Sequence, residues 1–131
     1  MLKNLFDLNG LVAVVTGAGG AMGSVIAEGL AYHGADVVVV AHKNKERIPK
    51  VIKTIESYGK KTLELNCDVT SQDDVDKMVK AVIDEFGRVD AYVNLPGYSF
   101  RVEAENVDIK DWEALISVNL TGTFRCAQAF G

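Results

Sequence analysis

Apolar runs alternate with amphipathic segments along the whole chain. Four runs rich in β-branched or alternating apolar residues predict strands, at residues 11–16, 35–41, 61–66 and 89–94. Apolar positions at helical spacing predict helices after them, at about residues 20–33, 45–58, 70–87 and 108–131. Strands that alternate with helices through short loops form right-handed crossovers. The pattern therefore predicts an α/β fold whose parallel sheet is covered on both faces.

The same spacing predicts which side of each helix faces the sheet. The first helix has one apolar stripe, formed by Met22, Ile26 and Leu30. The third helix begins with Thr70 or Ser71 as a cap, in a capping-box pattern, and its expected inward face comprises Val75, Met78, Val79, Val82, Ile83 and Phe86. The last helix is expected to direct inward Trp112, Leu115, Ile116, Leu120 and Phe124.

The bulk properties of the chain exclude several kinds of protein. Its 131 residues suffice for one domain with a buried core. A net charge of −4 without a basic tract argues against a nucleic-acid partner. No apolar run approaches the roughly 18 residues of a membrane span, and the N-terminus lacks the apolar core of a secretion signal. Cys67 and Cys126 fit no metal-site spacing and no disulfide framework, so we expect a reducing, cytoplasmic location.

A cluster of glycines joins the first strand to the first helix in the stretch VVTGAGGAMG. In an open α/β sheet, ligands bind beyond the carboxyl ends of the strands, and a helix N-terminus there attracts phosphate. Gly17, Gly19 and Gly20 let the backbone approach a ligand closely, and Gly23 lets the helix lie against the sheet. The cluster predicts a nucleotide site. The alternative is a tight strand–helix connection without a ligand, since the literal GxGxxG motif does not occur.

Four segments in order resemble motifs of the short-chain dehydrogenases/reductases. TGAGGAMG resembles the TGxxxGxG signature of that family, and CDVT resembles its adenine-contacting segment. VNLPG is similar to its NNAG motif, and SVNLTGTF to the helix segment that carries the Asn of its catalytic tetrad. The resemblance implies a Rossmann-like, doubly wound sheet with strand order 3-2-1-4. It also implies an NAD(P)(H)-dependent oxidoreductase that interconverts an alcohol and a carbonyl by hydride transfer.

The resemblance assigns roles to individual residues. The pyrophosphate would lie on the glycine turn and the start of the helix, at Gly17, Gly19, Gly20, Ala21, Met22 and Gly23. Asp68 would accept a hydrogen bond from the adenine amino group, with the backbone of Val69 beside it. Asn94 and Gly97 would line the adenosine ribose. Asp68 has an alternative role as a turn residue before the third helix.

Asn119 is the one residue of the catalytic tetrad that the resemblance assigns. It would interrupt its helix and hold the water of a proton relay. The alternative is a polar residue in the middle of a helix that faces solvent. Because Ile116, Leu120 and Phe124 flank Asn119, the sequence favours a buried role for it.

The chain also departs from the family pattern at two motifs. Ala21 stands where the family has its second glycine, which places a methyl group near the expected phosphate path. Leu95 and Pro96 replace Asn and Ala in the NNAG motif, and proline removes a backbone donor.

The end of the second strand bears on the choice of coenzyme. An acid there would bind the ribose 2′-hydroxyl and repel a 2′-phosphate. This strand instead ends in AHKN, where His42 and Lys43 suit a phosphate dianion. The sequence therefore favours NADP(H) over NAD(H), with Lys43 as a solvated loop residue as the alternative.

The YxxxK segment that the family needs for acid–base catalysis does not occur in these residues. We therefore interpret residues 1–131 as a dinucleotide-binding half-domain, truncated before the C-terminal half, in which an open edge of the fourth strand favours a homo-oligomer. The chain looks most similar to members of the family that act on polyols, sugar acids or 3-oxoacyl thioesters, and this resemblance implies a small alcohol or carbonyl substrate. The alternative is a non-catalytic nucleotide-binding or assembly fragment.

Overall fold

The computed structural model describes residues 5–131. At its centre lies a parallel sheet of four strands, β1 (Val12–Thr16), β2 (Asp36–Ala41), β3 (Thr62–Asn66) and β4 (Ala91–Asn94). The strand order is β3-β2-β1-β4, as the family resemblance implied. The Rossmann-like topology and the predicted α/β class are therefore confirmed.

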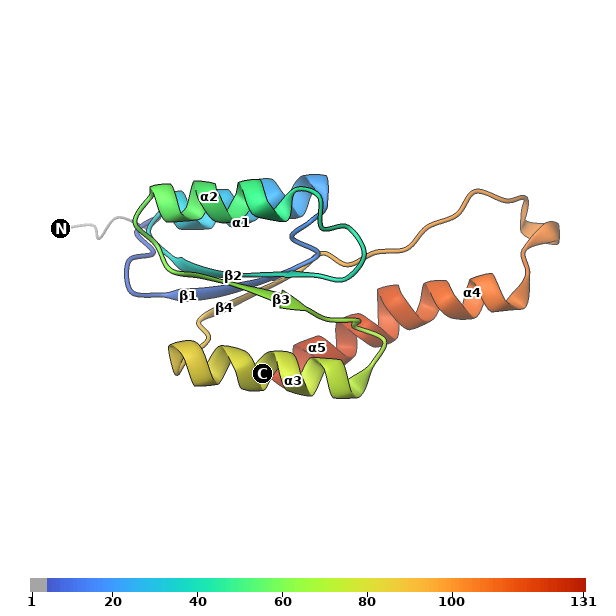
Figure 1. The fold of residues 1–131 in the computed structure, drawn as a ribbon. Helices are drawn as coiled ribbons and strands as arrows, with labels where there is room; N and C mark the ends of the chain where they lie inside the picture. The colour runs from blue at the N-terminus through green and yellow to red at the C-terminus, as the bar shows by residue number, and fades with distance from the viewer. Residues whose placement is uncertain (1–4) are drawn as a thin grey trace.

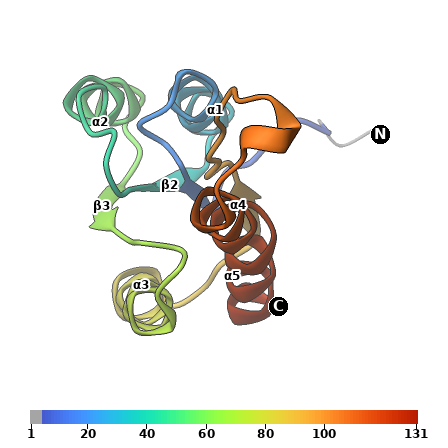
Figure 2. The ribbon, with the colours of Figure 1, turned by 90° about the vertical axis from the view of Figure 1, so that its right-hand side faces the viewer.

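Helices cover both faces of this sheet. Their bounds are α1 (Ala21–Tyr32), α2 (Ile48–Ser57), α3 (Gln72–Phe86), α4 (Ile109–Ile116) and α5 (Thr123–Phe130). A short 3₁₀ turn (Ala104–Asn106) precedes α4, and a π-helical segment (Ser117–Gly122) joins α4 to α5. In Figure 1, α1 and α2 lie on one face of the sheet and α3 and α5 on the other, and Figure 2 shows the same two layers from the side.

The valine runs of β1 and β2 form two cores because successive side chains point to opposite faces of a strand. Val15, Val37 and Val39 pack with the α1–α2 layer, whereas Val14 and Val38 pack with the α3–α5 layer. All five side chains are fully buried. This burial on both faces explains why these two strands read as continuous apolar runs.

The predicted inward stripe of α1 is wrong at Met22, which is 70% exposed. The buried face of this helix instead consists of small residues, among them Gly23, Ala27 and Ala31. A Cβ atom on Gly23 would lie 2.1 Å from the carbonyl oxygen of Gly17. The helix thus packs so closely against the turn that precedes it that only small side chains fit between the two.

The ends of α3 follow the sequence prediction, but one residue of its inward face does not. The Ser71 side chain accepts a hydrogen bond from the amide of Asp74 at 3.2 Å, and Gly87 ends the helix at a φ of +71°. Val75, Met78 and Val82 are buried as predicted. Ile83 is 46% exposed and is not part of the core formed by these residues.

The predicted single last helix is divided by its π-helical segment, and its predicted inward face is wrong at three of five positions. Three of the side chains expected to be buried are more than half exposed, namely Trp112, Leu120 and Phe124. Figure 1 shows α4 running beyond the end of the sheet. On this helix Leu115 and Ile116 are half-buried, whereas Trp112 is 52% exposed. α5 packs against α3 and β4, and there Cys126 is buried.

Within residues 5–131, no helix has the length and apolar content needed to cross a bilayer.

Candidate functional site

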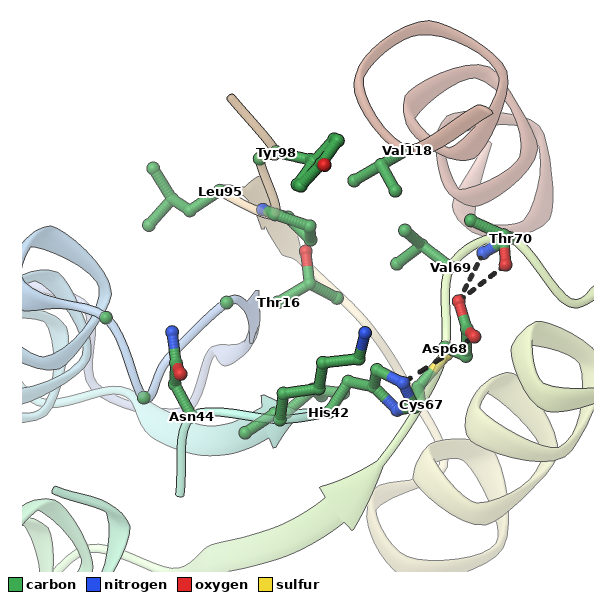
Figure 3. Close-up of a pocket in the computed structure, with 18 of the residues that line it drawn as sticks. Thr16, His42, Asn44, Cys67, Asp68, Val69, Thr70, Leu95, Tyr98 and Val118 are labelled. Carbon is green, nitrogen blue, oxygen red and sulfur yellow. Dashed lines mark hydrogen bonds and ion pairs between the residues drawn. The ribbon is translucent and has the colours of Figure 1, made fainter. Parts of the chain in front are cut away.

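A cavity of about 790 Å³ opens at the carboxyl ends of the four strands. Its walls come from the glycine turn after β1, from residues 40–44 at the end of β2, from residues 67–70 after β3 and from residues 95–98 after β4. Ala114 of α4, with Ser117 and Val118 of the π-helical segment, lines the remaining side of the cavity. Figure 3 shows Val118 facing Tyr98 and Val69 across this space. Four segments that are distant in sequence thus meet at one edge of the sheet.

Eight of the predicted site residues line this cavity, namely Gly17, Gly19, Gly20, His42, Lys43, Asp68, Val69 and Gly97. The other five lie outside its lining. Ala21, Met22 and Gly23 form the first turn of α1 behind the glycine turn. Asn94 lies at the end of β4, and Asn119 in the π-helical segment.

The glycine turn is held between the segments that follow β2 and β4. Gly17 has a φ of +74°, and a Cβ atom on it would lie 2.8 Å from the carbonyl carbon of Leu95. A Cβ atom on Gly19 would lie 1.6 Å from the carbonyl oxygen of Asn44. Any larger residue at either position would therefore displace backbone that forms the cavity wall.

The N-terminus of α1 has the features of an anion-binding site. Its cap residue Gly20 contributes no side-chain hydrogen bond, and its first turn holds no acidic residue. Ser71 caps α3 and Asp108 caps α4 through their side chains, whereas α2 and α5, like α1, have no side-chain cap. Of the three helices without such a cap, α1 is the one that follows the glycine turn lining the cavity. The amides of the first turn of α1 thus keep the partial positive charge that a phosphate group would neutralise.

Asp68 is fixed at the cavity wall by the start of the next helix. One carboxylate oxygen accepts hydrogen bonds from the hydroxyl and the amide of Thr70, at 2.7 and 2.9 Å. The other carboxylate oxygen lies 3.6 Å from Nε2 of His42. The hydrogen bonds from Thr70, with the nearby His42 and Lys43, lower the pKa of Asp68. Asp68 is therefore both a turn residue and an anionic group facing the cavity.

Behind the cavity, a hydroxyl–amide chain connects β1, β4 and α5. The Tyr92 hydroxyl lies 3.0 Å from the Thr16 hydroxyl and donates to the side-chain oxygen of Asn94 at 2.5 Å. The Asn94 amide donates to the Thr123 hydroxyl at 2.9 Å. Burial raises the pKa of Tyr92, so its phenol stays protonated and keeps both bonds. Asn94 thus acts within this network as a support for the cavity wall.

Asn119 joins the π-helical segment to the loop after β4. Its side chain donates to the carbonyl of Tyr98 and accepts from the amide of Tyr98, both at 2.8 Å. Its own carbonyl accepts the Thr123 hydroxyl at 2.7 Å. The predicted interruption of the helix is observed here. The predicted burial is wrong, because Asn119 and its neighbour Leu120 are exposed.

Sequence reasoning did not assign several residues that line the cavity, among them Asn44, Thr70, Leu95, Pro96, Ser117 and Val118. Most of them follow the ends of strands β2, β3 and β4, and that position was the available signal. Ser117 and Val118 reach the site only because the helix after β4 folds back over the strand ends. Helical periodicity does not report such a long-range contact.

The strand order, the cavity at the strand ends and the glycine turn define a Rossmann-type α/β protein. The family model described as short chain dehydrogenase matches residues 11–131, so the chain belongs to the short-chain dehydrogenase family.

The relatives fall in the same family. The chain is 36% identical over 133 residues to an NADP-dependent mannitol dehydrogenase of Alternaria alternata, a match that covers 99% of this chain and 50% of the relative. A solved short-chain type dehydrogenase/reductase from Mycobacterium marinum superposes with a TM-score of 0.90 at 33% identity, covering 95% of this chain and 50% of that one. An NAD⁺-bound xylitol dehydrogenase gives a TM-score of 0.87 at 31% identity, covering 94% and 47%. The chain spans about half the length of these relatives.

Proposed function

We propose that this chain is the cofactor-binding part of an NAD(P)(H)-dependent oxidoreductase that interconverts an alcohol and a carbonyl compound. The observation that carries the proposal is the uncapped N-terminus of α1 beside a glycine turn that lines the cavity. Backbone amides at such a position bind the pyrophosphate of a dinucleotide. The mannitol and xylitol dehydrogenases among the relatives support a nicotinamide coenzyme.

The residues present fit a dinucleotide along the whole cavity. At the glycine turn, the space that a Cβ atom on Gly19 would need is taken by the backbone of Asn44, so the turn presents bare main chain. Further along the wall, the Asp68 carboxylate offers an acceptor for the amino group of an adenine. Gly97 lines the cavity without a side chain, and among the atoms considered the one nearest to its Cβ position is Oδ1 of Asn119, at 3.9 Å.

The chain's own residues bind and orient, and the nicotinamide coenzyme would supply or accept the hydride. Gly17, Gly19 and Gly20 would hold the pyrophosphate, with Ala21, Met22 and Gly23 forming the helix turn behind them. The two hydrogen bonds between the Asn119 side chain and the Tyr98 backbone would fix the loop after β4, the cavity wall nearest the nicotinamide.

We further propose that the coenzyme is NADP(H) rather than NAD(H). His42 and Lys43 line the cavity at the end of β2, and residues 41–44 contain no acid that would repel a 2′-phosphate. The mannitol dehydrogenase relative is NADP-dependent, which supports this choice.

Titration with NADPH and NADH, followed by the fluorescence of the reduced nicotinamide, tests both proposals. We expect NADPH to bind more tightly and Lys43→Glu to reverse the order. Lys45→Glu, which changes an exposed lysine two positions away outside the cavity lining, is the matched control and should retain the preference. Equal affinities that Lys43→Glu leaves unchanged would refute the choice of coenzyme. A folded protein that binds neither coenzyme at about millimolar concentration, far above the affinities usual for such sites, would refute the function.

The remaining features of the proposal concern the whole protein. We propose a small alcohol or carbonyl substrate and a homo-oligomeric assembly. β4 pairs with β1 alone among the described strands, which leaves the outer edge of β4 unpaired in residues 5–131. Both cysteines are free thiols, which fits the proposed cytoplasmic location. Light scattering would test the assembly, and a monodisperse monomer at high concentration would contradict it.

A further inference from the structure

Arg125 connects helix α5 to the cavity wall that follows β3. Its Nη1 atom donates to the carbonyl oxygen of Val69 at 2.7 Å, and its Nε atom donates to the side-chain oxygen of Gln72 at 3.1 Å. Gln72 is the first residue of α3, and Figure 2 shows α3 and α5 side by side. Val69 lines the cavity, whereas Arg125 does not. The guanidinium thus holds this wall from outside the cavity.

The peptide unit between Val69 and Thr70 is held at both of its polar atoms. Its carbonyl oxygen accepts from Arg125, and its N–H, which belongs to Thr70, donates to the Asp68 carboxylate at 2.9 Å. Figure 3 shows the two hydrogen bonds from Thr70 to Asp68. A guanidinium bound to a carbonyl polarises the peptide and strengthens the bond that its N–H donates. Arg125 therefore acts on the Asp68 carboxylate through a single peptide unit.

The surroundings of Arg125 fix its guanidinium in this position. A Cβ atom on Gly122 would lie 2.8 Å from Cγ2 of Val69 and 3.2 Å from the Val69 carbonyl oxygen, so the start of α5 approaches this wall as closely as bare main chain allows. On the other side, the Gln72 amide donates to the Asp76 carboxylate at 2.8 Å, which leaves its oxygen facing Arg125. The bond from Arg125 to Val69 is thus supported by both helices.

We propose that Arg125 is a positioning residue for Asp68, and that it thereby sets how tightly this wall holds the adenine end of the coenzyme. This inference rests on the proposed function, in which the Asp68 carboxylate accepts a hydrogen bond from the adenine amino group. Arg125 acts only through the wall, because it lies outside the cavity lining. A residue without ligand contact changes a binding affinity when it fixes a group that does bind. The effect of Arg125 is therefore expected only for ligands that carry the amino group.

The test compares NADPH with its hypoxanthine analogue, in which an oxygen replaces the amino group of the adenine. The ratio of the two affinities, both measured by the fluorescence of the reduced nicotinamide, isolates the contact with Asp68. In the unmodified protein, we expect NADPH to bind about tenfold more tightly than the analogue, the size of one hydrogen bond to a charged acceptor. Arg125→Met keeps an apolar stem but removes both donors, and it should reduce this preference to about threefold or less.

Arg88→Met is the matched control. Arg88 also donates two side-chain hydrogen bonds, from Nε and Nη2 to the Asp90 carboxylate, at 2.8 and 2.6 Å. It precedes β4, so it lies at the opposite end of the strands from the cavity. This variant makes the same chemical change away from the wall and should keep the full preference for NADPH.

Two further variants separate positioning from a general loosening of the fold. Asp68→Ala should remove the preference, and Arg125→Met added to it should cause no further fall, because the two residues act as one unit. Arg125→Lys keeps the positive charge, but lysine lacks the planar fork that holds Val69 and Gln72 together. Its preference should lie between those of Arg125→Met and the unmodified protein. A general loosening would instead weaken both ligands equally and leave the ratio unchanged.

The outcomes separate this inference from the proposed function. Circular dichroism establishes that each variant is folded, and Arg125→Lys decides the question if Arg125→Met does not fold. If both ligands bind and the folded Arg125 variants keep the ratio of the unmodified protein, the inference is overturned and the proposed function stands. The same holds if the unmodified protein binds the two ligands equally. If a folded protein binds neither ligand, both the inference and the proposed function are overturned.

Discussion

The close packing of α1 against the glycine turn can be tested with two glycines of the same helix. A Cβ atom on Gly23 would lie 2.1 Å from the Gly17 carbonyl oxygen and 2.8 Å from the Cα atom of Ala18. A Cβ atom on Gly29 would have no neighbour within 4 Å among the atoms considered. Gly23→Ala and Gly29→Ala thus make the same chemical change at a crowded and at an open position.

The expected magnitudes follow from this difference. Replacing a helical glycine by alanine stabilises the helix by about 0.5–1 kcal/mol, and both variants share this gain. Gly23→Ala also forces backbone apart, and overpacking of this kind costs about 1–3 kcal/mol. Gly29→Ala should therefore stabilise the protein, and Gly23→Ala should be less stable than Gly29→Ala by about 1–3 kcal/mol.

Urea unfolding followed by circular dichroism gives the free energy of unfolding for each protein. A thermal scan provides a second measurement, and about 4 °C of difference in Tm is expected per kcal/mol at this size. Equal stabilities of the two variants would refute the reasoning, because the shared gain cancels and only the crowding at Gly23 distinguishes them.

Three further predictions concern the cap of α3, the buried tyrosine and the thiols. Ser71→Ala removes the oxygen that accepts from the first turn of α3 and should lower the free energy of unfolding by about 1 kcal/mol, whereas an unchanged value would contradict the cap. Tyr92→Phe removes two part-buried hydrogen bonds and should cost about 1–2 kcal/mol, while Tyr58→Phe at an exposed ring serves as the neutral control. Burial raises the pKa of Cys67 to about 12 and also raises the pKa of Cys126, so the native protein should resist iodoacetamide near pH 8, where only unfolded thiols ionise appreciably. Mass spectrometry should find both thiols labelled only in urea, and rapid labelling of the native protein would contradict their burial. Because the thiolate of Cys67 is disfavoured in the fold, the stability linked to it is full below pH 9.0 and is lost as the pH rises towards 12.

The sheet and its helices could be predicted from the sequence for a simple physical reason. The valine runs of β1 and β2 lower the free energy only when both faces are covered, which in turn requires a parallel sheet with helices on each side. The turn residues were equally informative, because Gly17 and Gly87 adopt positive φ values that few other residues tolerate. Most of the predicted cofactor residues line the cavity because they follow strand ends, and those ends meet at one edge of any parallel sheet.

The sequence alone did not determine which apolar side chains are covered. Met22 and Trp112 lie on apolar stripes, yet both are more than half exposed. Periodicity shows that a helix has an apolar face, but the distance to the sheet decides whether that face holds small or large residues. In α1 the close approach at Gly23 selects small residues, and α4 runs beyond the sheet altogether.

The contact between His42 and Asp68 likewise belongs to the tertiary structure. Each residue was assigned to the site from its position after a strand, but nothing in either segment indicates that the two side chains lie 3.6 Å apart. That distance depends on the register of β2 against β3, which pairs Ala41, the residue before His42, with Asn66, two residues before Asp68. The sequence by itself determined the fold, the glycine turn and the kinds of residue at the site. Only the packed sheet decided which of them touch, because contacts between distant segments depend on strand register and helix placement rather than on local pattern.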